Sequence, residues 1–164
     1  MRRFLFALIL VVACATGAAA DSYEDALSAF LRKDYALAAQ LFRLIAEQGN
    51  AKAQYNLGLM YDKGQGLPQD DREALKWYRK AAEQGHARAQ GNLGLIYAKG
   101  RGVPQDFTRA YMWLNVASSA LSGDEGKTAM KNRHHVVSQM TAAQIGKAQE
   151  MARRCQESQF KECD

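Results

Sequence analysis

The fold of this chain is decided by residues 46–81, AEQGNAKAQYNLGLMYDKGQGLPQDDREALKWYRKA, and by residues 82–117, AEQGHARAQGNLGLIYAKGRGVPQDFTRAYMWLNVA, which follow them without a gap. When the two stretches are aligned, 21 of their 36 positions are identical. A sequence that repeats with a period between about 20 and 50 residues is typical of stacked units, each of which buries its apolar face against the next. The sequence therefore predicts a solenoid.

Each unit has the pattern of two helices joined by a turn. In the first helix, Ala53, Leu57 and Tyr61 recur every four residues, and Gly58 beside them permits two backbones to approach closely. The turn at residues 64–68 combines two glycines with a proline and cannot continue a helix. The second helix has a buried face with the spacing i, i+3, i+4 and i+7, formed by Ala74, Trp77, Tyr78 and Ala81.

Capping residues mark the ends of these helices. Asn50 is expected to cap the first helix and Gly64 to end it, and Asp70 is expected to cap the second, which Gly85 ends. Glu73, three residues after Asp70, completes the pattern of a capping box. Because no stretch alternates apolar and polar residues as a strand does, the prediction is an all-α fold.

The flanking segments depart from the repeat. Upstream, residues 23–32 and 35–48 predict a third helix pair with a short turn, and downstream residues 124–140 and 142–159 predict two capping helices. Thr141 and Gln144 form a capping box at the start of the last helix. We expect one domain over residues 21–164, divided into an N-terminal pair (22–49), two repeats (50–85 and 86–121) and C-terminal helices (122–164).

The first twenty residues resemble a secretory signal peptide. Arg2 and Arg3 precede an apolar run at residues 4–13 that is too short for a membrane anchor, and three alanines end the segment at Ala20. Cleavage there predicts a periplasmic or secreted protein. The alternative is a lipoprotein, because residues 11–14 loosely resemble a bacterial lipobox in which Cys14 is lipidated. A membrane partner is expected only in that case.

Charge and cysteine content narrow the class of protein further. Removal of residues 1–20 leaves 20 basic and 17 acidic residues, a net charge of +3 that does not predict nucleic-acid binding. It also leaves two cysteines, Cys155 and Cys163, which in an exported protein predict a disulfide. A metal site is the alternative, but no histidine has the spacing to complete it, so we expect no metal and no cofactor.

The repeated pattern Ala-Gln-x-Asn-Leu-Gly-x-x-Tyr-x-x-Gly-x-Gly-x-Pro-x-Asp-x-x-x-Ala-x-x-Trp resembles the Sel1-like repeat, a relative of the tetratricopeptide repeat. The resemblance is close over residues 46–117 and weaker over residues 22–45. It implies a right-handed α-solenoid of antiparallel helix pairs that serves as a bacterial adaptor for partner proteins or peptides. In the tetratricopeptide relatives, the first helix of each pair lines the concave groove.

The partner-binding residues are predicted from that analogy. By this analogy, Asp62, Gly91 and Ala98 are also expected to face the concave groove. Asn56 and Asn92 lie beside these groove-facing positions. Their side chains would either bind the backbone of a peptide or form a hydrogen bond with a neighbouring helix. Flanking cations would favour an acidic partner. The predicted contacts are Lys52, Tyr55, Asn56, Leu59, Lys63, Arg88, Asn92, Leu95 and Lys99.

No catalytic set is predicted. The Gly-x-Gly segments follow a helix and precede a proline, so they are turns and not phosphate-binding loops. The three histidines have no ligand spacing. The main rival function is a secreted hydrolase, because some cysteine-rich relatives are described as β-lactamases. The repeats here contain no cysteine, so we expect a non-enzymatic protein of the cell envelope, and a lipid-anchored envelope scaffold is the third possibility.

Overall fold

The computed structural model describes residues 15–163, and side chains from residue 22 onward. This part of the chain contains eight helices and no strand. The helices are α1 (Ala15–Leu31), α2 (Tyr35–Glu47), α3 (Ala51–Lys63), α4 (Asp71–Ala82), α5 (Ala87–Lys99), α6 (Phe107–Ala120), α7 (Gly123–Val137) and α8 (Ala142–Glu157).

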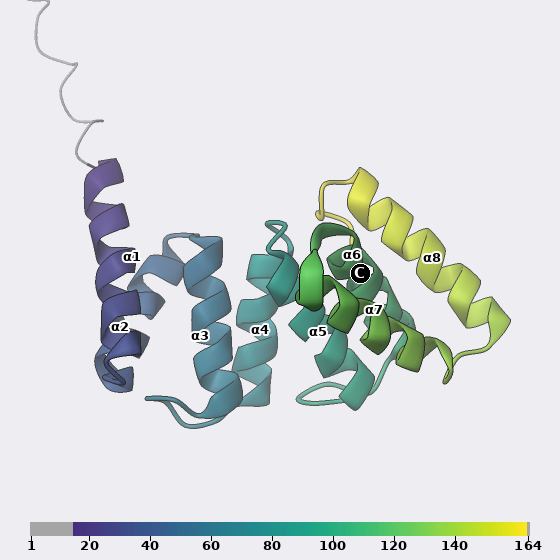
Figure 1. Ribbon diagram of the computed structural model, residues 1–164, viewed down its shortest axis with the longest axis horizontal. Coiled ribbons are helices and arrows are strands. Elements are labelled where there is room, and N and C mark those ends of the chain that lie inside the picture. Colours follow the sequence, from purple (N-terminus) through teal and green to yellow (C-terminus); the bar gives the residue numbers. More distant parts are fainter. Residues whose placement is uncertain (1–14, 164) are drawn as a thin grey trace, which may run out of the picture.

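The helices form three pairs that stack in a row, followed by two further helices (Figure 1). Each helix from α1 to α6 packs against the next one along the chain. Helix α7 packs against α6 and touches α5, whereas α8 turns back and lies against α6. The all-α solenoid predicted from the repeat is therefore confirmed.

Most of the predicted caps form. Asn50 accepts a hydrogen bond from the Ala53 amide at 3.0 Å, and Gly64 ends α3 in the left-handed conformation. The capping box of Thr141 and Gln144 is complete. One detail of the prediction is wrong: Asp70 caps α4, but Glu73 does not reach back to it.

The carboxylate of Glu73 instead receives hydrogen bonds from Lys76 at 3.0 Å and from Nε1 of Trp77 at 3.2 Å. These partners lie one turn further along the same helix, where they hold the carboxylate away from the N-cap. Helix α4 ends at Ala82, before the predicted Gly85, which forms the following turn with φ +82°.

The helices of each pair approach closely at the predicted glycines. A Cβ atom on Gly58 would lie 2.8 Å from the Tyr78 ring, and one on Gly94 would lie 2.7 Å from Cγ of Leu114. Core residues at equivalent positions of the two repeats are buried, including Trp77 and Trp113. These aromatic side chains belong to the packing, as predicted.

Successive helix pairs are joined by side-chain hydrogen bonds that recur every 36 residues. The buried side chains of Gln54 and Gln90 donate to the carbonyl oxygens of Ala46 and Ala82 at 3.0 and 3.1 Å. Each glutamine thus satisfies a carbonyl group at the end of the preceding helix. Arg43 and Arg79 likewise donate to the hydroxyls of Tyr61 and Tyr97.

The N-terminal helix begins earlier than predicted. Helix α1 starts at Ala15, crosses the predicted cleavage point at Ala20 and ends at Leu31. Residues 1–14 of the predicted signal peptide, with Cys14, lie outside the described residues. Among the described residues, no helix combines the length and apolar content needed to cross a membrane.

The predicted disulfide joins Cys155 to Cys163. Both cysteines are buried, and the loop that they close carries Phe160 against the turn between α4 and α5. A Cβ atom on Gly85 in that turn would lie 3.1 Å from Cε2 of Phe160. The loop closed by the disulfide therefore contacts the end of the first repeat, and α8 itself packs against α6.

Candidate partner-binding groove

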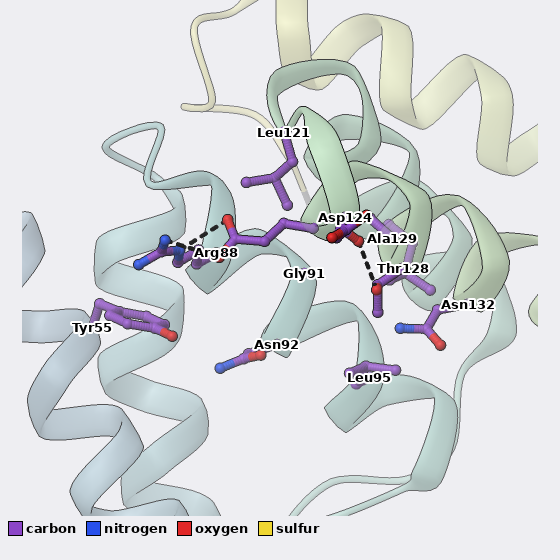
Figure 2. Close-up of a pocket in the computed structure, with 12 residues that line it drawn as sticks. Tyr55, Arg88, Gly91, Asn92, Leu95, Leu121, Asp124, Thr128, Ala129 and Asn132 are labelled. Carbon is purple, nitrogen blue, oxygen red and sulfur yellow. Dashed lines mark hydrogen bonds and ion pairs between the residues drawn. The ribbon is translucent and has the colours of Figure 1, made fainter.

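Two adjoining cavities lie between α5 and α7, and we call them together the α5–α7 groove. Leu95 and Asn132 line both cavities, so the two lie one after the other along a single groove. The first, of about 340 Å³, is lined by Tyr55, Arg88, Gly91, Asn92, Leu95, Leu114, Leu121, Asp124, Glu125, Thr128, Ala129 and Asn132 (Figure 2). The second, of about 470 Å³, is lined by Leu95, Ala98, Lys99, Gln105, Phe107, Asn132, His135, Val136 and Gln139.

The groove has the length of a short peptide. Its two walls run in the same direction, because Arg88 meets Glu125 near the starts of α5 and α7, while Lys99 and His135 lie near their ends. Arg88 and Lys99 are separated by eleven positions on α5, which corresponds to about 16 Å along a helix. An extended chain covers that distance with about five residues.

An ion pair connects the two walls at the first end of the groove. Nη2 and Nε of Arg88 lie 2.8 and 3.1 Å from the two carboxylate oxygens of Glu125. The hydrogen bond to Glu125 raises the pKa of Arg88. Because this paired geometry already compensates the Arg88 charge, Arg88 is a weaker attractor for an acidic partner than the sequence predicted.

Tyr55 forms the end wall of the first cavity. Its ring stacks on His86 with centroids 4.6 Å apart and tilts against Tyr78 at 5.9 Å. Partial burial raises the pKa of Tyr55, and its hydroxyl has no hydrogen-bond partner among the described residues. His86 caps α5 through Nδ1, which accepts from the Ala89 amide at 3.3 Å. Burial, followed by the nearby Arg88 charge, lowers the His86 pKa.

Both repeat asparagines contact neighbouring helices. Asn56 donates to the hydroxyl of Tyr23 at 3.0 Å, and Asn92 hydrogen-bonds the hydroxyl of Tyr78. The structural role that the sequence left open is therefore present for both. Asn92 still faces the groove, where Asn132 stands on the opposite wall with Leu95 between them (Figure 2).

The predicted contacts from the first repeat lie elsewhere. Neither cavity includes Lys52, Leu59 or Lys63, and of the predicted contacts in that repeat only Tyr55 reaches the groove. Asp62 is bound by other residues of the solenoid: it accepts a hydrogen bond from the Tyr78 hydroxyl at 3.4 Å and forms an ion pair with Arg101 at 2.5 Å. In the second repeat, Arg88, Asn92, Leu95 and Lys99 all line the groove.

Comparison with known proteins identifies the repeat. The Sel1 repeat model matches three successive segments, residues 18–50, 51–86 and 87–120, which together make up more than half of the chain. The chain belongs to the Sel1 repeat family. The second and third segments agree within one residue with the predicted repeats, and the first shows that the looser N-terminal pair is also a Sel1 repeat.

Two solved structures resemble the chain. One is a protective antigen of uropathogenic Escherichia coli strains with an SLR fold, which is 31% identical with a TM-score of 0.78 over 88% of this chain and 32% of that chain. The other is a Sel1 repeat protein from Oxalobacter formigenes, which is 33% identical with a TM-score of 0.62 over 73% of this chain and 49% of that chain. The chain thus spans about a third and about half of their lengths. No curated protein matches it.

Sel1 repeats generally mediate protein–protein interactions, and proteins with this fold are typically non-enzymatic scaffolds. Within the described residues, no three His, Cys, Asp or Glu side chains gather as a set of metal ligands.

The far wall of the groove was missed by sequence reasoning. Helix α7 shares no repeat identity with the Sel1 units, so residues 124–140 were predicted only as a capping helix. A signal was nevertheless present, because Glu125, Ala129, Asn132 and Val136 follow the spacing i, i+4, i+7 and i+11 of one helix face. That face is the one that lines the groove.

Proposed function

We propose that this chain is an exported adaptor of the bacterial cell envelope that holds an extended segment of a partner protein in the α5–α7 groove. The observation that carries the proposal is the groove itself. It combines an apolar floor, formed around Leu95, with polar side chains on both walls, notably Asn92 and Asn132. Apolar pockets with a few convergent polar groups are typical of binding sites.

The two asparagines suit a peptide backbone. The amide oxygen of Asn92 and the whole amide of Asn132 have no hydrogen-bond partner among the described residues, although Asn92 donates to Tyr78. An extended segment presents both N–H and C=O groups at regular intervals, and asparagine side chains both accept and donate. Such contacts give affinity without requiring one particular sequence.

Two features support an exported location. The first twenty residues have the layout of a secretory signal peptide, and the disulfide between Cys155 and Cys163 is of the kind that persists in oxidising compartments. The mass of the mature N-terminus tests this part of the proposal. Cleavage after Ala20 gives an unmodified Asp21, whereas the lipoprotein alternative gives an acylated Cys14.

Site-specific photocrosslinking tests the adaptor function. A photoreactive residue is placed at Asn132 in the groove, and in a control variant at Gln40, which is exposed on α2 and lines neither cavity. We expect a discrete crosslinked protein at Asn132 that is absent at Gln40. Equal crosslinking at both positions, or none at Asn132, would contradict binding in the groove. Turnover of nitrocefin by the mature protein would favour the hydrolase instead.

A further inference from the structure

The two complete repeats differ at the position that shapes the groove. Tyr55 on α3 corresponds to Gly91 on α5, one residue before the shared asparagine. In the earlier repeat, the Tyr55 ring occupies the space between Tyr78 and His86. In the later repeat, Leu114 takes the place of Tyr78, and no side chain enters the corresponding space from position 91.

That space is the first cavity of the groove. Gly91, Leu114, Leu121 and Ala129 form its apolar lining, and Thr128 and Asp124 add polar atoms. A Cβ atom on Gly91 would meet only Cβ of Ala117, at the ordinary contact distance of 3.8 Å. The backbone therefore does not require glycine here, in contrast to Gly94 one turn later, where a Cβ atom would clash with Leu114.

We propose that an aromatic side chain of the partner occupies the hollow over Gly91, in the place that Tyr55 fills in the preceding repeat. The proposal rests on the adaptor function and names the chemistry of the segment that is bound. An aromatic ring suits this site because the hollow has an apolar floor and polar atoms at its rim, and because the same fold already packs a tyrosine between equivalent helices.

Charge specifies a second feature of the segment. Lys99 lines the second cavity, and among the described residues it has no ion-pair partner, whereas Arg88 is paired with Glu125. Gly91 and Lys99 are eight positions apart on α5, or about 12 Å, which an extended chain covers in about four residues. Residues four apart point to the same side of an extended chain. The bound segment therefore carries an acidic residue about four positions from its aromatic anchor.

Nuclear magnetic resonance titration tests the anchor directly. N-acetyl-L-tyrosinamide is added to the mature protein, and backbone amide shifts are followed; N-acetyl-L-leucinamide serves as the comparison probe. We expect saturable shifts at Gly91, Leu95 and Ala129, with the tyrosine probe binding about fivefold more tightly than the leucine probe. The variant Gly91→Tyr fills the hollow with the chain's own ring and is expected to abolish these shifts.

A second glycine supplies the matched control. Gly146 is exposed on α8, and a Cβ atom there would meet nothing within 4 Å. Gly146→Tyr adds the same ring to a helix outside the groove and should leave the titration unchanged. The anchor is overturned if no saturable shift occurs at the groove residues, if the leucine probe binds equally well, or if Gly91→Tyr binds the tyrosine probe as the parent does.

The two proposals fail differently. If a partner still crosslinks at Asn132 and its crosslinking is unaffected by Gly91→Tyr, the adaptor function stands and the aromatic anchor is wrong. If the tyrosine probe binds over Gly91 but no protein crosslinks at Asn132, the hollow accepts a ring and the adaptor function is contradicted.

Discussion

The repeats at residues 50–85 and 86–121 have the same scaffold and different surfaces. Their scaffold bonds recur every 36 residues: Gln54 and Gln90 each donate to the end of a preceding helix, and the loop side chains of Gln69 and Gln105 each donate to a carbonyl group of the helix before them. The residues that make these bonds are identical in both repeats.

Two positions that line the groove differ between the repeats. Where the first repeat has the ring of Tyr55, the second has Gly91, and where the first has Asp62, held by Tyr78 and Arg101, the second has Ala98. Both replacements remove side-chain volume on the side that faces α7. The comparison teaches that the two repeats share their scaffold bonds, and that the loss of two side chains in the second repeat opens space beside α7. Asn92, Leu95 and Lys99 line that space although the first repeat has the same residue types at these positions.

The largest expected effect concerns the two glycines of α5. A Cβ atom on Gly94 would lie 2.7 Å from Leu114 Cγ and 3.1 Å from the Ala110 carbonyl oxygen. The carbonyl oxygen belongs to the backbone of α6 and cannot move aside as a flexible side chain could. Gly94→Ala should therefore lower the free energy of unfolding by about 2 kcal/mol. Gly91→Ala should raise it by about 0.5 kcal/mol, because alanine favours a helix.

Urea unfolding followed by circular dichroism measures both glycine variants. If Gly94→Ala were as stable as the parent, the close contact between α5 and α6 would not be a requirement of the scaffold. If Gly91→Ala were destabilised instead, the backbone would need glycine at position 91, and the hollow would be a consequence of folding alone.

Tyr55→Gly makes the first repeat resemble the second. The loss of ring contacts with Tyr78 and His86 should lower the free energy of unfolding by about 1–2 kcal/mol. The variant should also gain a second site for N-acetyl-L-tyrosinamide, which chemical shift changes at Tyr78 and His86 would reveal. Tyr23→Phe is a control, because it retains the ring on Phe42 and removes only the hydroxyl that Asn56 contacts.

The N-caps of the two repeats should respond differently to pH. His86 caps α5 only when its Nδ1 is unprotonated, and burial lowers its pKa below the ordinary value of 6.5. The unfolded chain therefore takes up this proton before the folded chain does. The contribution of the His86 cap to the free energy of unfolding is therefore complete above about pH 6.5. It is lost as the pH falls through the pKa of His86 in the folded protein.

His86→Asn gives α5 the same kind of cap as Asn50 gives α3, and asparagine does not titrate. We expect the parent to lose about 1 kcal/mol relative to this variant on acidification, a typical value for an N-cap. Thermal unfolding of both proteins between pH 7.5 and 4.5 measures the difference, since other titrating groups contribute equally to the two. Parallel pH profiles would show that the His86 cap does not titrate with folding.

The smallest effect separates two equivalent lysines. Lys63 and Lys99 end α3 and α5 and are both exposed, but only Lys99 lines the groove. Against an acetylated, amidated peptide with tyrosine and glutamate four positions apart, Lys99→Glu should weaken binding about threefold at low salt. Lys63→Glu makes the same change in net charge and should leave the affinity unchanged. Equal losses for both variants would indicate a diffuse charge effect, which fluorescence anisotropy would detect.

The sequence by itself determined the scaffold. The 36-residue period, the spacing of Leu57 and Tyr61, and the glycines at positions 58 and 64 predict the helix pairs and their order, because each feature acts within one repeat or between adjacent ones. The disulfide near the C-terminus could be predicted on a different ground, because two cysteines in a predicted exported protein favour a bond and these two lie close together in the sequence.

Only the tertiary structure decided where the groove lies. Arg88 meets Glu125 although they are 37 positions apart, and α7, which has no repeat pattern, forms the second wall. The sequence gives no measure of which polar side chains are already satisfied: Asp62 was expected in the groove but is held by Tyr78 and Arg101. Periodicity specifies which face of a helix is apolar, whereas a cavity depends on the residues that several helices place around it.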